Sequence, residues 1–240
     1  MRSMAVGWLA ISAALGSMPA VAAEGLAPFV AEYDVRYGSM AVGSSRTLLS
    51  RGAQDGHWTM ESRSTASGFA RMIAGGTLVQ RSTFESSGDG LRPLSYSFDD
   101  GTRRTSRDVR LEFDWGHGIV RGTAEDEPVE VAAISGLQDA ASMQALVLLR
   151  LRSGTEPGTI AMIEKERIKV YRYTFLRRER LRTALGELDT LAYRSARDGS
   201  DRETISWFAP SLGYAVVQAE QRVEGKRGFQ TLIRRFQAGG

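Results

Sequence analysis

The feature that most constrains the fold is a two-residue alternation of apolar and charged side chains. Between residues 29 and 37, Phe, Ala, Tyr, Val and Tyr occupy the odd positions, and the even positions include Glu, Asp and Arg. Because successive side chains of a β-strand point to opposite faces, this pattern predicts a strand with one buried and one solvated face. The same alternation over residues 58–65 and 108–115 predicts two further antiparallel strands.

β-rich stretches also fill the second half of the sequence, at residues 168–175, 188–193, 204–208, 214–223 and 229–236. Turn-forming pairs such as Asp-Gly and Glu-Gly separate them. About ten to thirteen strands joined by short turns predict a mainly β fold, because so wide a flat sheet would twist apart. We expect one large antiparallel meander that curls into a barrel or half-barrel.

One segment departs from the alternation. Residues 138–152 are rich in Ala, Leu, Met and Val, contain no glycine or proline, and predict an α-helix. Either Ser135 or Asp139 is suited to cap its first turn, and Gly154 to end it. Apolar side chains cover most of the helix circumference, so we expect it to be buried against the concave face of the sheet or across one end.

The N-terminus has the order of side chains that is typical of a secretory signal. A short basic start precedes an apolar stretch over residues 6–18, which small side chains follow. We interpret residues 1–23 as a signal peptide, cleaved after Ala22 or Ala23, and residues 24–240 as a single β-rich domain. An uncleaved anchor is the alternative, although a membrane helix needs about 20 apolar residues. No later segment is apolar enough to span a membrane, which favours a soluble protein of the periplasm.

The composition excludes several kinds of site. The sequence contains no cysteine, which rules out disulfide bonds, thiolate metal sites, cysteine nucleophiles and a lipid-modified N-terminal cysteine. The formal net charge is only +3, although charged residues make up 25% of the chain. A charge so nearly balanced does not require a nucleic acid partner, and we expect none.

Residues suited to catalysis are few and isolated. His57 and His117 both adjoin turn formers, and neither has a neighbour at the spacing of a helical metal site. The carboxylates at residues 99–100 and 125–127 also lie among turn formers, where charged runs are usually solvated. Phosphate-binding glycine loops and the Gly-x-Ser-x-Gly motif are absent. We therefore expect a protein that is not an enzyme and has no catalytic, metal or cofactor site.

Arginines are the remaining candidates for ligand recognition. Arg178, Arg180 and Arg182 share one face of a predicted strand, where guanidinium groups suit the phosphates of lipid A or other anionic envelope polymers. The alternative, which we favour, is that these arginines decorate an exposed strand, protect sheet edges and pair with nearby glutamates such as Glu179 and Glu187.

Several short segments occur in a characteristic order along the chain. They are Pro-Phe-Val-Ala-Glu-Tyr-Asp-Val at residues 28–35 with Val-Gly at 42–43, and the runs at 167–173, 183–190, 207–210 and 213–214. Their order and spacing resemble those of the bacterial domain-of-unknown-function family numbered 3108. The resemblance implies an exported, β-rich fold without an assigned activity, and it brings no catalytic residues with it.

The segment around residues 207–214 is also similar to the strand-turn-strand of periplasmic lipoprotein carriers, in which a helix covers an acyl-chain cavity in a curved half-barrel. This likeness implies a ligand groove, for which the candidate residues are Trp207, Phe208, Pro210, Tyr214, Met143, Leu146 and Val147. The alternative is structural, with Trp207 as a core anchor and Pro210 in a turn.

Two functional hypotheses follow. The first is a non-enzymatic periplasmic protein whose curved sheet encloses an apolar groove that binds a lipid-like or amphiphilic envelope ligand. The second is a module that docks on another envelope protein, with a filled barrel core and an exposed apolar patch. A hydrolase is a third alternative, and it would need perturbed carboxylates around a histidine in a cleft.

Overall fold

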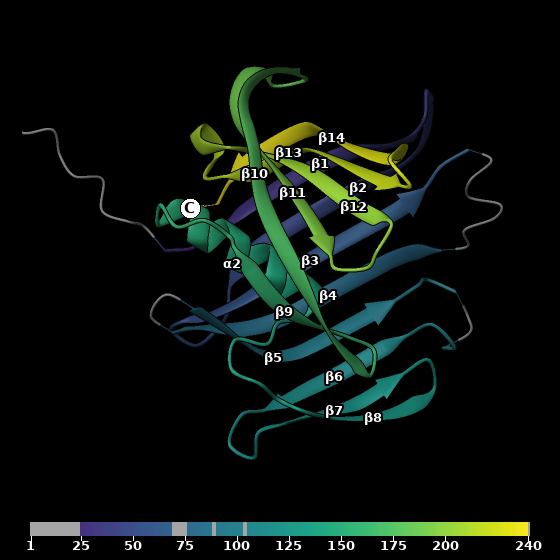
Figure 1. Ribbon diagram of the computed structural model, residues 1–240, viewed down its shortest axis with the longest axis vertical. Helices are drawn as coiled ribbons and strands as arrows, with labels where there is room; N and C mark the ends of the chain where they lie inside the picture. The colour runs from purple at the N-terminus through teal and green to yellow at the C-terminus, as the bar shows by residue number, and fades with distance from the viewer. Residues whose placement is uncertain (1–24, 69–75, 88–89, 103–104, 240) are drawn as a thin grey trace, which may run out of the picture.

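The computed structural model describes residues 25–68, 76–87, 90–102 and 105–239, so the predicted signal peptide lies outside the described residues. Within them, fourteen strands form one antiparallel sheet against which the helix α2 packs (Figure 1). The first strands are β1 (Phe29–Tyr37), β2 (Met40–Arg51), β3 (His57–Ala66), β4 (Thr77–Ser87), β5 (Gly90–Asp99), β6 (Val109–Asp114), β7 (Ile119–Ala124) and β8 (Glu127–Ala132). After α2 (Ala140–Arg152) come β9 (Thr159–Glu164), β10 (Arg167–Thr183), β11 (Gly186–Arg197), β12 (Arg202–Ala209), the 3-10 helix η1 (Pro210–Leu212), β13 (Ala215–Val223) and β14 (Lys226–Ala238).

The strand order follows the chain in two runs that meet in the middle of the sheet. β1 pairs with β2 on one side and with β14 on the other, so the sheet runs from β8 to β1 and then from β14 to β9. The edge strands β8 and β9 are connected through α2 and are not paired with each other. The predicted fold class is therefore confirmed as a barrel-like meander that hydrogen bonds do not close. The described residues form fourteen strands against the ten to thirteen expected, and four of them, β6 to β9, have only six residues each.

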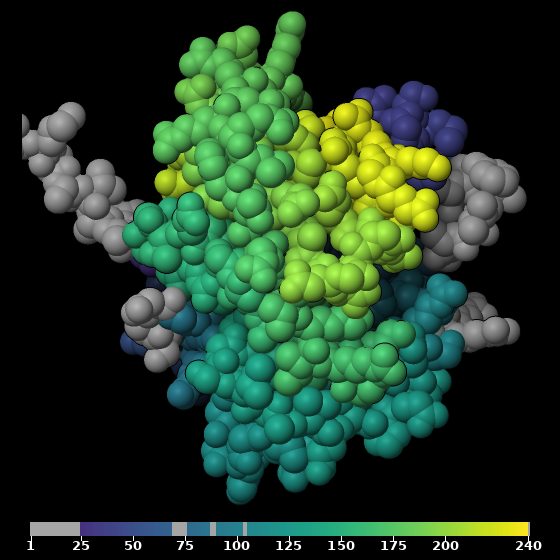
Figure 2. Space-filling view, in the orientation of Figure 1, coloured from purple at the N-terminus to yellow at the C-terminus, as the bar shows by residue number. Residues whose placement is uncertain are grey.

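Curvature brings the two runs face to face. Bulges interrupt the pairing of β1 with β14 at Glu32/Tyr33 and with β2 at Val35/Arg36, and others occur in later pairs. A bulge bends a strand and increases its twist. In the space-filling view, the strands of the second run lie in front of those of the first (Figure 2).

The helix α2 lies against the concave face of the sheet, in contact with β3, β4, β5 and β9. Asp139 caps it, because its carboxylate accepts hydrogen bonds from the backbone N–H groups of Ala141 and Ser142, each at 2.8 Å. The Ser142 hydroxyl in turn accepts from the Asp139 N–H at 2.9 Å, which completes a capping box. The helix ends at Arg152, two residues before the left-handed Gly154.

α2 begins two residues later than the sequence predicted, because the chain before it pairs with β9. Gln138 is extended rather than helical, and it forms a parallel bridge with Met162 of β9. Its side-chain amide donates to the carbonyl of Leu91 in β5 at 2.9 Å. Gln138 therefore links β9 to the first run of the sheet across the concave side.

Two apolar clusters form the core. The larger one surrounds α2 and includes the fully buried Phe84 and Leu49 together with Leu146 of the helix. The smaller one lies under β6 to β8 and includes Leu111 and Val120. Burial of each such side chain contributes about 1.5–3 kcal/mol to stability. Among the helices of the described residues, none has the length and hydrophobicity of a membrane span.

Candidate functional site

A cavity of about 490 Å³ lies between the two runs of the sheet and beside α2. We call it the chamber. β1 to β4 contribute Phe29, Tyr33, Ser45, Thr47, Met60, Ser62, Ser64 and Gln80, α2 contributes Ala140, Met143, Gln144, Val147 and Leu148, and the second run contributes Met162, Tyr171, Tyr173, Ser195, Thr204, Ser206, Phe208, Val216, Ala219, Gln221 and Thr231. Among these described lining residues, none carries a charged side chain at neutral pH.

Rows of small hydroxyl side chains explain why the chamber is hollow. Ser45 and Ser64 face each other across β2 and β3, where the Ser64 hydroxyl donates to Ser45 Oγ at 3.0 Å. Thr47 and Ser62 form the next inward pair of the same two strands. Side chains this small cannot reach across to the opposite run, so the inward positions leave space and polar groups.

Buried tyrosines and one glutamine supply further donors. The Tyr33 hydroxyl donates to the carbonyl of Val216 at 3.0 Å, and burial raises its pKa well above the ordinary value. Burial likewise raises the pKa of Tyr173 to about 12, so both phenols stay neutral at physiological pH. Gln80 Nε2 is buried and has no hydrogen-bond partner among the described residues. The wall thus offers neutral donors and acceptors, one of them unused.

A second cavity, of about 890 Å³, lies at the end of β1 farthest from α2. We call it the mouth, and Ser64 lines both it and the chamber. Its apolar side chains include Met40, Tyr37 and Phe229, which are 63%, 51% and 48% exposed. The rings of Tyr37 and Phe229 lie 5.1 Å apart across the β1–β14 pair. Exposed apolar side chains that gather in this way are typical of ligand-binding grooves and of surfaces that bind other proteins.

Asp139 is a buried acid next to the chamber wall in the sequence, since Ala140 and Met143 of its helix line that wall. The Ser82 hydroxyl donates to Asp139 Oδ2 at 2.6 Å. Desolvation raises the pKa of Asp139 to about 6, against the opposing effect of hydrogen bonds from Ser82, Ser142 and Ala141. Its hydrogen bonds commit this carboxyl to capping α2.

The structure brings together some of the predicted groove residues and not others. Met143 and Val147 of α2 line the chamber, as does Phe208 of β12, whereas Leu146 is buried elsewhere in the core. The remaining three lie outside the chamber wall, at Trp207, Pro210 and Tyr214.

Each of these three has a structural role. The Trp207 indole is buried and donates to Glu179 Oε1 of β10. Pro210 begins η1 and is exposed, and Tyr214 has a positive φ of 64° directly after that turn. The hydroxyl rows were not predicted, although Ser and Thr alternate in phase with buried apolar residues in the sequences of β2 and β3.

A family model described as "protein of unknown function (DUF3108)" matches residues 32–227, which extend from β1 into β14. The chain belongs to the DUF3108 family. The resemblance drawn from the sequence is thereby confirmed, and the matched region includes nearly all strands of the sheet. No curated protein matches this DUF3108 chain.

One solved structure supports the fold of this DUF3108 protein. The chain is similar, with a TM-score of 0.58 and 9% identity, to a β-barrel-like protein of the domain of unknown function DUF1849 from Brucella abortus, over 90% of this chain and 99% of that one. A protein from Bacteroides fragilis, described as exported with a YmcC-like fold, gives a TM-score of 0.36 at 9% identity over 89% and 97% of the two chains. A protein from Parabacteroides distasonis, described as a lipoprotein, gives 0.39 at 8% identity over 88% and 96%. The first likeness shows the fold alone.

The arginine row of the DUF3108 protein lies on β10 and outside the chamber. Arg178, Arg180 and Arg182 are all exposed. Arg180 pairs with Asp189 at 2.9 Å, whereas Arg178 and Arg182 form no ion pair within the described residues. Exposed pairs of this kind contribute little to stability.

Neither histidine lines the chamber or the mouth. His57 Nε2 lies 4.0 Å from Glu85, and His117 Nδ1 lies 2.6 Å from Asp114 in an exposed turn. Hydrogen bonds from the backbone and side chain of His117 lower the pKa of Asp114. The acidic turn at residues 125–127 contributes an ion pair between Glu125 and Lys165 at 2.7 Å.

Proposed function

We propose that this protein is a non-enzymatic binding protein of the periplasm that holds a lipid-like or amphiphilic envelope ligand inside its curved sheet. The single observation that carries the proposal is the chamber, whose volume of about 490 Å³ is available between the two runs. Cavities of roughly 300–1,000 Å³ are the usual size of small-molecule sites. The buried helix of the first hypothesis forms part of the chamber wall.

Two adjoining environments favour an amphiphile over a purely apolar molecule. The chamber wall presents hydroxyls, amides and Met side chains, whereas the mouth presents Tyr37, Met40 and Phe229. An uncharged polar group of the ligand is suited to the hydroxyl rows, where it would meet the unused Gln80 donor. An apolar chain is suited to the mouth, where its burial would remove exposed aromatic surface from water.

A displacement assay tests this proposal. The purified protein would be titrated with N-phenyl-1-naphthylamine, a neutral fluorescent amphiphile, and then with a monoacylglycerol, whose polar group is uncharged, as competitor. We expect saturable fluorescence that the competitor reverses. In Ser62→Phe the new ring would occupy the chamber, and we expect affinity to fall at least about tenfold.

The matched control is Ser50→Phe, at a position of β2 that lines neither the chamber nor the mouth. Its affinity should stay within about twofold of the parent protein. The proposal fails if the parent protein gives no saturable signal, or if Ser62→Phe binds as the parent does while its circular dichroism is unchanged.

The second candidate function is a module that docks on another envelope protein. The observation that favours it is the exposed apolar surface at Tyr37, Met40 and Phe229. Crosslinking in cells from a photoreactive group at Met40 would recover one repeated protein partner in this case. Recovery of lipid from the same position, without a protein partner, would favour the first function.

The proposed periplasmic location has its own test. Fractionation of cells followed by N-terminal sequencing should find the protein in the periplasm, with a mature chain that begins at Ala23 or Glu24. An intact N-terminus in the membrane fraction would favour the uncleaved anchor.

A further inference from the structure

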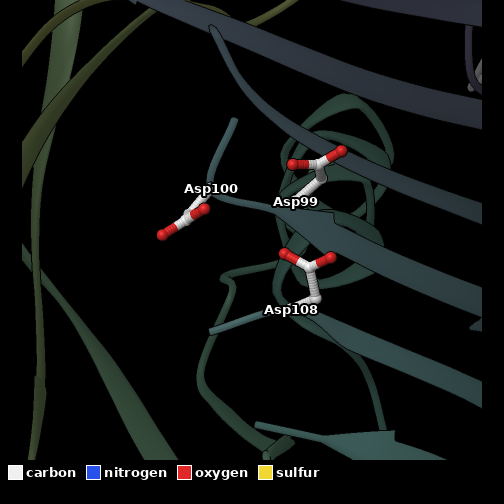
Figure 3. Close-up of side chains that lie close together, drawn as sticks. All are labelled: Asp99, Asp100 and Asp108. Atoms are coloured by element: carbon white, nitrogen blue, oxygen red, sulfur yellow. The ribbon is translucent and has the colours of Figure 1, made fainter. Parts of the chain in front are cut away.

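Three carboxylates lie close together where β5 ends and β6 begins (Figure 3). None of them lines the chamber. Phe98 and Val109 are the last pair of β5 and β6, so Asp99 and Asp108 occupy the next facing positions of the two strands. Asp100 follows directly. Ligand oxygens from the three side chains all lie within 4.8 Å of one another.

Like charges at facing positions of an antiparallel pair repel each other, and burial strengthens the repulsion. The Asp108 side chain is only 10% exposed. Arg110 offers partial compensation, since its guanidinium lies 3.6 Å from Asp108 Oδ2.

An independent observation indicates that a ligand belongs here. Asp108 Oδ1 is buried and has no hydrogen-bond partner among the described residues. The Asp108 carboxylate points toward that of Asp99 (Figure 3). A buried carboxylate oxygen without a donor retains its desolvation cost, and a cation at this point would remove it.

The backbone holds the other two carboxylates in place. Asp99 Oδ1 accepts from the N–H of Gly101 at 2.7 Å, and Asp100 Oδ1 accepts from that of Thr102 at 2.9 Å. Gly101 has a φ of 72°, and a Cβ there would lie 2.5 Å from the carbonyl oxygen of Thr77. This close approach requires glycine, so the turn that orients Asp99 is fixed by the first residue of β4.

We propose that Asp99, Asp100 and Asp108 bind one hard divalent cation, Ca²⁺, with water completing its coordination. Carboxylate oxygens are the ligands that Ca²⁺ prefers, and at about 2.3–2.6 Å from the ion they lie up to about 5 Å apart. Ca²⁺ also accepts irregular geometry, whereas Mg²⁺ requires a near-ideal octahedron at about 2.0–2.1 Å. Asp100 also lines the mouth, so the ion would lie near its rim, but the site does not depend on what the chamber binds.

The test is calorimetric titration of the chelator-treated full chain with CaCl₂, at constant ionic strength. We expect one bound ion per chain, an affinity in the range of about 10⁻⁵–10⁻³ M, and a rise in the unfolding temperature at about 1 mM Ca²⁺. Asp108→Asn keeps the shape of the side chain and removes its charge. We expect it to weaken Ca²⁺ binding at least about tenfold.

Asp55→Asn provides the matched control, because Asp55 lies in an exposed turn between β2 and β3. Its Ca²⁺ affinity should remain within about twofold of the parent. If Asp108→Asn does not fold, Asp99→Asn takes its place, with the same expected loss. Absence of any bound ion up to about 10 mM Ca²⁺, or equal binding by the Asp108→Asn and Asp55→Asn variants, would overturn the proposal.

Discussion

The interior of the sheet is filled at the end that holds Leu49 and Phe84, and it is hollow between α2 and the mouth, although inward positions alternate in the same way in both regions. On β2 the inward residues change from Leu49 to Thr47 and then Ser45. β4 repeats the change, from the fully buried Phe84 through Ser82 to Gln80. The pleat of a strand determines which side chains point inward. Side-chain volume decides whether they fill the space.

The largest expected effect comes from removing a large side chain at the filled end, which reduces this contrast. Phe84→Ala should lower the free energy of unfolding by about 3–5 kcal/mol, because the packed surroundings of α2 cannot collapse into the cavity. The companion variant Ser62→Ala, on the chamber wall, should change it by less than about 1 kcal/mol. Urea unfolding of both proteins measures the difference. Equal losses would mean that the chamber is packed in solution.

The pH dependence of stability tests Asp139, which bonds to Ser82 between the filled and the hollow region. Because burial raises the pKa of Asp139 to about 6, ionisation destabilises the fold as the pH rises from the ordinary aspartate range to about 6. The parent protein should therefore lose about 2 to 3 kcal/mol from this group between about pH 4 and pH 7. Asn caps helices well, so Asp139→Asn should lack that loss. The quantity to measure is the difference in unfolding free energy between the two proteins at each pH. A constant difference would contradict the assignment.

The outer face of the same sheet should respond to pH with the opposite sign. Desolvation acts to raise the pKa of Glu61, but hydrogen bonds and charges from Arg63 and Arg81 outweigh it and lower the pKa. The stabilisation is present above the ordinary glutamate range and is lost as the pH falls through the lowered pKa. Glu61→Gln should therefore lower the free energy of unfolding by about 1 to 2 kcal/mol at pH 7, a modest loss because its exposed arginine partners regain water. In strong acid the loss should be small, because Glu61 itself is then uncharged. If denaturant titrations gave the same loss of unfolding free energy at pH 7 and in strong acid, packing and not charge would explain the effect.

The smallest expected effect is at the hollow end. Ser206→Val adds side-chain volume at a position that faces the open chamber, so its stability should stay within about 1 kcal/mol of the parent. Its affinity for N-phenyl-1-naphthylamine should change, since the wall loses a hydroxyl. A loss of stability like that of Phe84→Ala would remove the distinction between the two regions.

Much of the fold could be predicted from local patterns. The alternation in β1 and β3 and the apolar run of α2 identified a curled meander with a buried helix, because pleat and helix period depend on neighbouring residues only. The site depended on distant pairs. The facing of Ser45 and Ser64 follows from strand register, and the bond from Trp207 to Glu179 joins separate strands. A single sequence does not specify such pairs, so Trp207 was assigned to a groove that it does not line.

The pairing of β1 with β14 has a consequence for how the molecule acquires its structure. Glu32 and Arg234 are in contact although 202 positions separate them in the chain. Closing so long a loop is slow, and the edges that await a partner are open to aggregation. A chain still emerging from a ribosome or a membrane pore cannot complete the sheet until its last strand has arrived. Until β14 pairs with them, β1 and β13 are both unpaired sheet edges. We therefore expect a chaperone to protect the chain from aggregation most effectively during this period.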